Sequence, residues 1–283
     1  MALDIPETLS PSKVSTFTDC ALAFRFVAID KIPKPPSEAT VKGTLVHRAL
    51  ELLFAFEPSQ RTFENALECL VTATADLEPT AEWQALELTA DQQQKLCSDA
   101  KVLIEKYFQL ENPSEIQPVG LELFVEHFIE QKNSTMHVRG VIDRLEVSSE
   151  GIVITDYKTG RAPSISAHQN RLTGVNIYAY LCEKTRQERP AKVQLLYLGT
   201  PAVVETIPTE QSLRQVERKL TSIWSAIETA CEKENFRPKP SRLCNWCPYQ
   251  QWCPEYGGDP ARARDEFLAS GRDYPLPPPA LRR

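Results

Sequence analysis

Two neighbouring stretches rich in Val, Ile and Thr place carboxylates where two β-strands would meet. They are Gly140-Val-Ile-Asp-Arg144 and Gly151-Ile-Val-Ile-Thr-Asp-Tyr-Lys-Thr-Gly160, joined by a short polar turn. Strand side chains alternate between faces, so Asp156 and Lys158 share one face while Tyr157 points to the other. A two- or four-residue turn centred on Ser149 and Glu150 would set Asp143 directly across from Asp156, whereas a bulged three-residue turn would break that register. Because opposed carboxylates repel each other, this hairpin favours a cation between them, and Mg²⁺ and Mn²⁺ prefer oxygen ligands.

Each of these residues also has an ordinary explanation. Asp156 can pair with Lys158 on a solvated strand, and Asp143 can pair with Arg144. His47, at the end of the stretch Gly43-Thr-Leu-Val-His47 on an earlier helix, is by itself more often a satisfied histidine than a ligand. The combination of two carboxylates, a lysine and a histidine favours a metal site over these separate explanations.

The charge balance and the absence of known motifs exclude several classes of protein. The 283 residues carry 32 Lys and Arg against 38 Asp and Glu, a net charge of −6, which argues against coating nucleic acid or membrane by bulk attraction. No apolar run spans a bilayer, and residues 1–11 lack the basic and apolar parts of a secretory signal, so we expect a cytoplasmic protein without a membrane partner. The sequence contains no GxxxxGK[ST] phosphate loop, helix-turn-helix, zinc finger or RRM, so neither an ATPase nor a base-specific reader is expected.

The eight cysteines fall into two groups. Four of them stand singly in helix-like stretches and are expected to pack as small apolar side chains: Cys69, Cys97, Cys182 and Cys231. The other four are Cys20 and the C-x2-C-x5-C triplet of Cys244, Cys247 and Cys253, in a segment rich in Pro and Trp. Two residues between thiolates allow one tight loop to present both to a single centre, so the triplet predicts a metal site. Zinc and a [4Fe-4S] cluster both accept four cysteines, and the spacing does not choose between them.

Periodicity and turn residues predict an α/β chain. Helices are expected over about 11–27, carrying Cys20, then 41–56, two or more within 62–110, then 169–188 and 209–234. Strands are expected over 119–128, 136–147, 151–158, 193–198 and 202–207, the first three as an antiparallel meander. The residues after 257 are rich in Pro and Arg and are expected to form a loose surface segment.

Three motifs, at 43–47, 140–144 and 156–160, resemble in order and approximate spacing those of RecB-type nucleases in the PD-(D/E)XK superfamily. The resemblance extends over residues 11–254 and implies an α/β restriction-endonuclease-like core, a central mixed sheet flanked by helices, with a helical insert and a C-terminal cysteine clamp. It implies that His47, Asp143 and Asp156 ligate Mg²⁺ or Mn²⁺ and that the Tyr157 carbonyl completes the site. Lys158 would orient the attacking water and stabilise charge.

The resemblance also suggests secondary site residues. Glu122 is similar to a further acidic position of the family, although Glu126 lies close enough to compete for that alignment. Family members usually carry a Gln and a Tyr four residues apart on the helix after the lysine strand. Asn176 and Tyr180 match this pair, with Asn in place of Gln, so Tyr180 is expected at the catalytic site. A solvated polar stripe accounts for the same pattern equally well.

A subset of these nucleases, including helicase–nuclease subunits and a CRISPR-adaptation nuclease, holds a [4Fe-4S] cluster between one cysteine before the core and three after it. The four residues Cys20, Cys244, Cys247 and Cys253 reproduce that order, so the resemblance implies an iron–sulfur cluster, with Zn²⁺ as the alternative. Backbone contacts to DNA are expected from residues that flank the motifs: Arg144, Arg161, Arg171, Asn176 and Tyr180.

The function implied by this resemblance is that of a divalent-metal-dependent exonuclease acting on single-stranded DNA or DNA ends in repair or recombination. The alternative is a non-catalytic DNA-binding or scaffolding subunit of a helicase–nuclease or CRISPR-adaptation complex. Intact Asp143, Asp156 and Lys158 favour the enzyme. The expected organisation is N-terminal helices with the His motif (1–60), a helical insert (61–118), the nuclease core (119–235), the cysteine segment (236–257) and a flexible tail (258–283).

Overall fold

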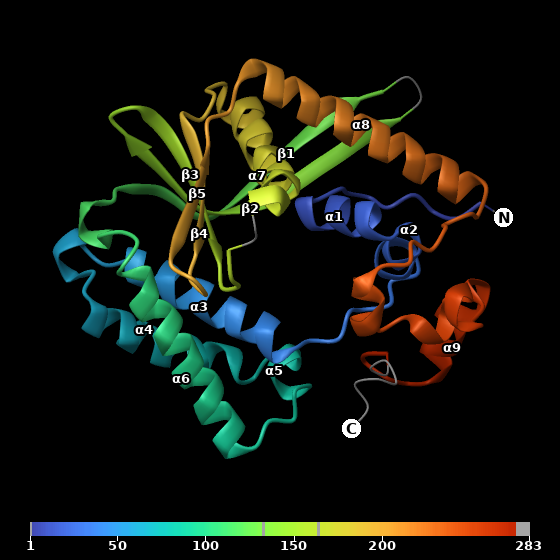
Figure 1. The fold of residues 1–283 in the computed structure, drawn as a ribbon, viewed down its shortest axis with the longest axis horizontal. Helices are drawn as coiled ribbons and strands as arrows, with labels where there is room; N and C mark the ends of the chain where they lie inside the picture. Colours follow the sequence, from blue (N-terminus) through green and yellow to red (C-terminus); the bar gives the residue numbers. More distant parts are fainter. Residues whose placement is uncertain (1, 132–133, 163–164, 276–283) are drawn as a thin grey trace. The chain divides into compact units, whose positions relative to one another are not determined.

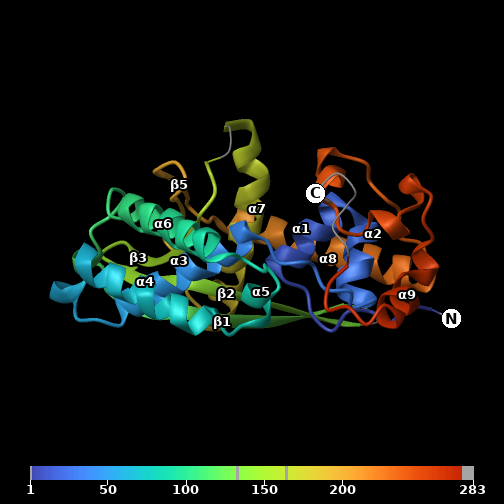
Figure 2. The ribbon, with the colours of Figure 1, turned by 90° about the horizontal axis from the view of Figure 1, so that it is seen from below.

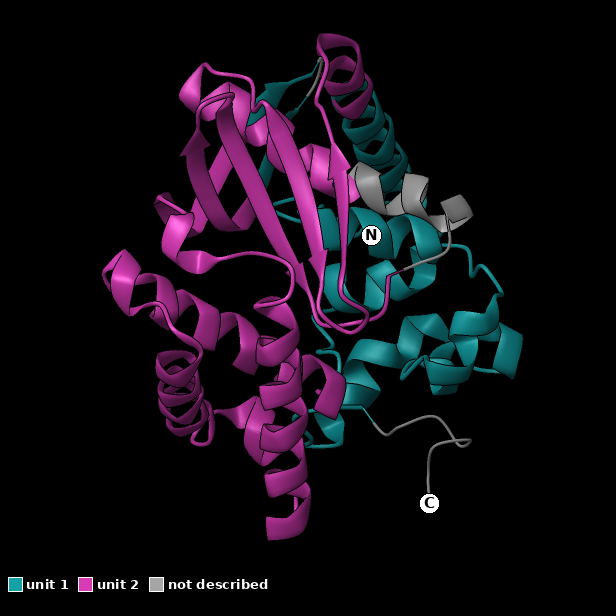
Figure 3. Ribbon diagram, turned by 60° about the vertical axis from the view of Figure 1, so that its left-hand side comes forward, with its two compact units in different colours: residues 1–35, 128–139, 217–283 teal, residues 36–127, 140–216 magenta. Residues whose placement is uncertain are grey.

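The computed structural model describes residues 2–131, 134–162 and 165–275, and it describes side chains outside 165–173. The chain divides into two compact units, which Figure 3 colours separately. Unit 1 comprises residues 1–35, 128–139 and 217–283, and unit 2 comprises 36–127 and 140–216. The candidate metal ligands of the hairpin therefore belong to unit 2, and the cysteine triplet belongs to unit 1.

A five-stranded mixed sheet forms the centre of the fold (Figure 1). Its strands, in the order β1-β2-β3-β4-β5, are β1 (Pro118–Glu130), β2 (Thr135–Ser148), β3 (Gly151–Lys158), β4 (Lys192–Tyr197) and β5 (Ala202–Thr206). The β2–β3 and β4–β5 pairs are antiparallel, whereas β3 and β4 are parallel. A parallel pair requires a crossover, which helix α7 (Ile165–Arg186) supplies. The mixed sheet with flanking helices confirms the expected α/β fold class.

One face of the sheet in unit 2 is covered by a layer of helices (Figure 2). The layer consists of α3 (Glu38–Phe54), α4 (Phe63–Leu77), the short α5 (Ala81–Gln84) and α6 (Ala90–Tyr107), with 3₁₀ turns at Pro58–Gln60 and Pro113–Glu115. Its apolar core includes Tyr157 of β3 and Leu196 of β4, which are partners in the parallel ladder and so share a face. Helix α3 begins at Glu38, three residues earlier than predicted, because Ser37 and Thr40 form a capping box there.

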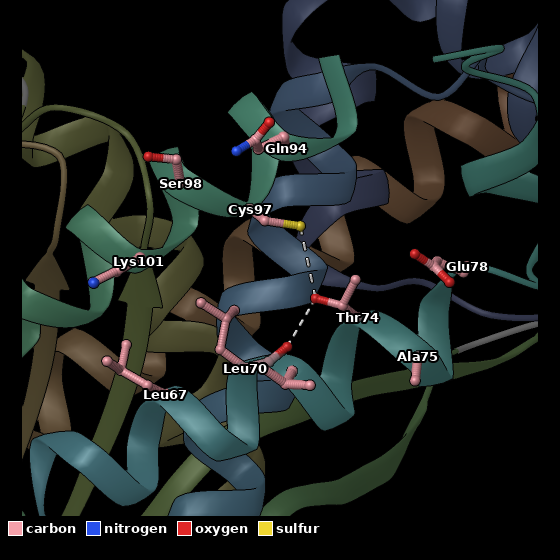
Figure 4. Close-up of a pocket in the computed structure, with 10 residues that line it drawn as sticks. Leu67, Leu70, Thr74, Ala75, Glu78, Gln94, Cys97, Ser98 and Lys101 are labelled. Carbon is pink, nitrogen blue, oxygen red and sulfur yellow. Dashed lines mark hydrogen bonds between the residues drawn. The ribbon is translucent and has the colours of Figure 1, made fainter. Parts of the chain in front are cut away.

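An open groove of about 580 Å³ lies between α4 and α6 in this helical layer (Figure 4). Leu67, Leu70 and Cys97 are among its lining residues, and the Thr74 hydroxyl donates to the Leu70 carbonyl at 2.8 Å and lies 3.9 Å from Cys97 Sγ. None of the residues selected from the motifs lines this groove. Cys97 is half-buried here, whereas Cys69, Cys182 and Cys231 are buried as predicted.

Unit 1 is built from helical segments at both ends of the described chain. They are α1 (Pro11–Asp19), α2 (Ala21–Phe24), a π-helical turn (Arg25–Ile29), most of α8 (Glu210–Glu232), 3₁₀ turns at Arg242–Trp246, Gln250–Trp252, Pro254–Tyr256 and Pro260–Arg262, and α9 (Ala263–Ala269). The single helix predicted over 11–27 is wrong, because Cys20 has extended backbone angles (φ −161°, ψ 111°) that end α1 and begin α2. Among the described residues, no helix is long and apolar enough to cross a bilayer.

The segment expected to be a loose tail is structured over its described part. Gly258 N–H donates to the Cys253 carbonyl at 3.0 Å, and α9 follows. The Phe267 ring meets Trp252 edge-on at 6.4 Å between centroids, and Trp252 Nε1–H donates to Glu266 at 3.0 Å. The prediction failed because a composition rich in Pro and Arg does not show that one apolar side chain, Phe267, packs against the ring of Trp252. Residues 276–283 lie outside the described residues.

If α9 stabilises unit 1 through Phe267, then Phe267→Ala should lower the free energy of unfolding by about 3 kcal/mol, the usual cost of emptying a buried phenylalanine site. Leu268→Ala is the matched control, since Leu268 is 64% exposed and should change stability by less than about 0.5 kcal/mol. Urea denaturation followed by Trp fluorescence measures both. Equal midpoints for the two variants would show that α9 is dispensable for the fold.

Candidate active site

Three side chains from three elements of unit 2 bring possible ligand atoms within 4.8 Å of one another. They are His47 of α3, Glu122 of β1 and Asp143 of β2. His47 Nδ1 lies 3.5 Å from Asp143 Oδ2. The structure therefore brings together two predicted ligands, and adds a second carboxylate to them. An imidazole nitrogen and carboxylate oxygens form a donor set that suits a divalent cation such as Mn²⁺.

The backbone of Tyr157 links two of these groups. Its N–H donates to Asp143 Oδ2 at 2.7 Å, and its carbonyl oxygen lies 3.1 Å from His47 Nε2. Burial by itself would lower the pKa of His47, but the hydrogen bond and charge of Asp143 outweigh that effect, so the pKa is raised. The carbonyl that the sequence selected as a further ligand therefore adjoins the predicted histidine.

The predicted register of the hairpin is confirmed from Arg144 to Gly151. Arg144 pairs with Thr155 and Ser148 with Gly151, as a two-residue turn requires, and Asp143 and Asp156 are the next residues beyond the last of these pairs. Asp156 is 4% exposed and forms an ion pair with Lys158. Burial, followed by the charge of Asp143, raises the pKa of Asp156 to about 6, even though Lys158 opposes the shift. The two aspartates thus repel each other in a site that a cation would stabilise.

Glu122 is the acidic residue that the structure selects over Glu126. Its backbone is left-handed (φ 44°), an uncommon conformation for a residue other than glycine. In a regular strand the two glutamates would lie on one face, but the left-handed residue interrupts the alternation. Partial desolvation and the charge of Asp143 raise the pKa of Glu122 to about 7. Strained backbone of this kind is often found at functional sites.

Helix α7 presents Tyr178, which sequence reasoning missed, toward these carboxylates. Burial and then the charges of Asp156, Asp143 and Glu122 raise the pKa of Tyr178. A Cβ on Gly140 would lie 2.8 Å from Tyr178 Cε1, so the glycine three residues before Asp143 makes room for this ring. The face of the sheet that carries Asp156 is therefore covered by α7.

The residues selected earlier on α7 lie elsewhere. The Tyr180 ring is 1% exposed, meets His127 of β1 at 5.9 Å and lies 5.3 Å from Lys184 Nζ. Asn176 Oδ1 is buried and has no hydrogen-bond partner in the described part of the chain. The sequence favoured Tyr180 because the residue four positions before it, Asn176, has a side-chain amide like that of Gln. The residue four positions before Tyr178 is Gly174, which has no side-chain amide. The contact that selects Tyr178 joins residues far apart in the chain, so no local sequence pattern could have identified it.

The expectation that Arg144 contacts DNA is wrong. The side chain is fully buried beneath the sheet, where its guanidinium forms a two-pronged ion pair with Glu111. It also donates to the Tyr157 hydroxyl at 2.8 Å and lies 4.8 Å from the Phe54 ring centre. Asp143 and Arg144 thus point to opposite faces, and the arginine anchors the residue whose backbone holds Asp143. Arg161 is exposed after β3, and the side chain of Arg171 lies outside the described residues.

The four cysteines of the second predicted site share one environment in unit 1. Burial raises the pKa of the Cys247 thiol, and the charges of Cys20, Cys253 and Cys244 add to the shift, whereas a hydrogen bond from the Tyr249 backbone opposes it. Trp252 and Tyr249 each pack against Phe26, at 6.0 and 5.3 Å between ring centroids. The thiols of the four predicted cysteines are therefore gathered in unit 1.

Comparison with known proteins agrees with this geometry. A family model described as the PD-(D/E)XK nuclease superfamily matches residues 8–254. The chain belongs to the PD-(D/E)XK nuclease superfamily. Nucleases of this superfamily generally use divalent metal ions, and the group of His47, Glu122 and Asp143 provides a donor set that fits one.

Two relatives of this PD-(D/E)XK nuclease extend the comparison. The Gene 69 protein of Mycobacterium phage D29 is 23% identical over 266 residues, which cover 87% of this chain and 96% of that protein. The crystal structure of a "Putative exonuclease" from Eubacterium rectale matches 84% of this chain and 86% of its own, with a TM-score of 0.54 and 12% identity. At that identity, the second match shows a shared fold.

The contact between Gly140 and Tyr178 leads to a test of the site. Gly140→Ala should displace the Tyr178 ring, because a methyl group has no room at 2.8 Å, and should lower nuclease activity by about tenfold or more. Gly174→Ala is the matched control, since a Cβ there meets nothing within 4 Å and a helical alanine adds about 0.5–1 kcal/mol of stability. Rates measured on labelled DNA, together with circular dichroism, separate displacement from unfolding. Full activity of Gly140→Ala would show that nuclease activity does not depend on the position of the Tyr178 ring.

Proposed function

We propose that this PD-(D/E)XK nuclease is a divalent-metal-dependent deoxyribonuclease that digests single-stranded DNA or DNA ends as an exonuclease. The observation that carries the proposal is that His47 lies next to Asp143 and that Asp156, on the neighbouring strand, forms an ion pair with Lys158. The His47 imidazole and the carboxylates of Asp143 and Asp156 are the proposed metal ligands, and the Lys158 ammonium group lies beside them. The intact set also favours an enzyme over a scaffolding subunit.

The roles of the residues follow from phosphodiester chemistry. A divalent cation bound by His47, Glu122, Asp143 and Asp156 would neutralise charge on the phosphate and lower the pKa of water. Lys158 is 39% exposed at its side chain, so its ammonium group can reach a phosphate while Asp156 holds it in place. It would orient the attacking water and stabilise the negative charge that develops on the phosphate oxygens. The Tyr178 hydroxyl is a candidate for contact with the same phosphate.

We propose that the cysteines hold a [4Fe-4S] cluster. Cys20, Cys253 and Cys244 all lie close enough to Cys247 to influence its thiol, which supports one shared centre. The order of one cysteine before the core and three after it resembles the iron–sulfur subset of these nucleases and favours the cluster over zinc. Cys20 is far in sequence from the triplet, so the cluster would cross-link the chain and stabilise it.

The biological setting that fits these proposals is DNA repair or recombination in the cytoplasm. A helicase or a CRISPR-adaptation protein would be a fitting partner, since the sequence contains no phosphate loop of its own.

Replacing either Asp143 or Lys158 should nearly abolish digestion of DNA. We expect Asp143→Ala and Lys158→Ala to lower the rate on labelled single-stranded DNA with Mg²⁺ or Mn²⁺ by at least about 10²-fold. Lys95→Ala is a matched control, because Lys95 also pairs with an aspartate, Asp99, but on the exposed surface of α6. It should retain the parental rate, since exposed pairs add little stability.

Two comparisons identify the outcomes. An exonuclease should degrade linear single strands and leave circular ones intact, whereas cutting of circles would indicate an endonuclease. Equal degradation by the two site variants and the parent would point to a contaminating nuclease and contradict the site.

Cation binding should weaken as the pH falls. Protonation of Glu122 (pKa about 7) and Asp156 (pKa about 6) competes with the ion, so the Kd for Mn²⁺ should rise about tenfold or more between pH 8 and pH 6. Without the ion, the raised pKa values mean that ionising these groups costs stability as the pH rises toward 7. Mn²⁺ should therefore raise the melting temperature more at pH 8 than at pH 6.

Isothermal titration in buffers of different ionisation enthalpy measures both the affinity and the protons released. Glu122→Gln should reduce the pH dependence between pH 8 and pH 7. A Kd that is independent of pH in the parent would contradict the assignment of these carboxylates.

The cluster predicts a colour. Protein purified without oxygen should be brown, with broad absorbance near about 400 nm and about four irons per chain. Cys247→Ser should lose the colour and the iron, while the control Cys97→Ser, in the groove between α4 and α6, should keep both. A colourless, zinc-containing, folded protein would overturn the iron–sulfur assignment and leave the nuclease site unaffected.

A further inference from the structure

The 3₁₀ turn Arg242–Trp246 carries both exposed apolar residues and a half-buried cysteine. A 3₁₀ helix has three residues per turn, so residues three apart lie one above the other. Leu243 and Trp246 form one such row and are 58% and 62% exposed. Cys244 lies in the same turn, Cys247 caps its C-terminal end, and both are half-buried. The segment that carries these two half-buried thiols therefore also exposes an apolar pair to solvent.

Trp246 differs from the other tryptophans of the chain. Trp83, Trp224 and Trp252 are each 3% exposed. The turn that carries Trp246 is well held, since Gln250 Nε2 donates to the Cys244 carbonyl at 2.5 Å and Ser241 caps the Leu243 N–H at 3.2 Å. A large aromatic ring on a rigid support loses little conformational entropy when a flat ligand stacks on it.

The charges around this turn favour a polyanion. Between Asn235 and Pro254 the sequence contains Arg237, Lys239 and Arg242 and no carboxylate, in a chain whose net charge is −6. Lys239 Nζ is engaged with the Thr18 carbonyl at 2.9 Å. Arg237 and Arg242 are exposed, and neither pairs with a carboxylate among the residues that the structure describes. Arg242 thus lies in the same turn as the exposed ring, and Arg237 precedes that turn in the sequence.

We propose that Trp246 is a stacking platform for single-stranded DNA, with a base on the indole and the adjoining phosphates on Arg237 and Arg242. The proposal rests on the DNA nuclease function and adds a binding surface in unit 1. Unstacked bases of a single strand expose the flat faces that an indole binds, whereas a duplex hides them. Stacking should contribute more to affinity than the exposed arginines do, because salt screens exposed ionic contacts.

The test measures binding without cleavage. Full-length, iron-loaded protein with Lys158→Ala is titrated into a labelled oligothymidylate of about 20 nucleotides, and anisotropy gives the Kd. Adding Trp246→Ala should raise the Kd by about tenfold or more, while Trp246→Phe should stay within about threefold of the parent, since stacking needs a flat ring. Leu268→Ala, which removes an equally exposed apolar side chain on α9, should leave the Kd unchanged.

Salt dependence separates stacking from charge. Arg242→Gln should reduce the slope of log K against log salt concentration by about 0.7, the value for one phosphate contact on a single strand. Trp246→Ala should leave the slope as it is. Iron content and melting temperature, compared across the variants, show whether the cysteine turn is intact.

The outcomes distinguish this surface from the nuclease function. An intact Trp246→Ala protein that binds the oligonucleotide as tightly as the parent would overturn the proposal, as would a preference for blunt duplex over the single strand. Loss of binding in Trp246→Ala, combined with a parental chain that cuts no DNA, would support the surface and reject the nuclease. Active protein should show a raised KM with little change in kcat when Trp246 is replaced by Ala.

Discussion

The peptide backbone of Tyr157 is the constraint on which the candidate active site depends. Its N–H binds Asp143, its carbonyl contacts His47, and its ring is held from the other face of the sheet by Arg144. One residue thereby fixes the separation of a strand carboxylate and a helix imidazole. The buried ion pair of Arg144 with Glu111 keeps that residue in place, so the polar network under the sheet serves the geometry above it.

The same arrangement concentrates negative charge. The charge of Asp143 acts on Asp156, and Glu122, whose own backbone is left-handed, lies beside Asp143. Their mutual repulsion, together with burial, raises the pKa of Glu122 and of Asp156. This crowding of negative charge lowers the stability of the folded protein, and a divalent cation bound at the proposed site would offset that loss. In unit 1 the thiols are likewise gathered by elements from both ends of the described chain.

The sequence by itself determined the local parts of this protein. Segments rich in Val, Ile, Phe and Thr, separated by short turns, predicted the five strands, and the turn between β2 and β3 predicted the register that the structure has from Arg144 to Gly151. These features depend on neighbours within a few residues, so pattern and turn length suffice to predict them. The motif order indicated the nuclease superfamily, and the cysteine spacing selected the thiols that share one environment.

Only the tertiary structure decided which side chains complete the site. It selected Glu122 over Glu126 through a left-handed backbone, and Tyr178 over Tyr180 through the space above Gly140. It also buried Arg144, which the sequence had placed at the surface, and ended α1 at Cys20. Each of these outcomes depends on contacts between elements far apart in the chain. A periodic pattern predicts which face of a helix or strand a residue occupies, but not which other element packs against that face.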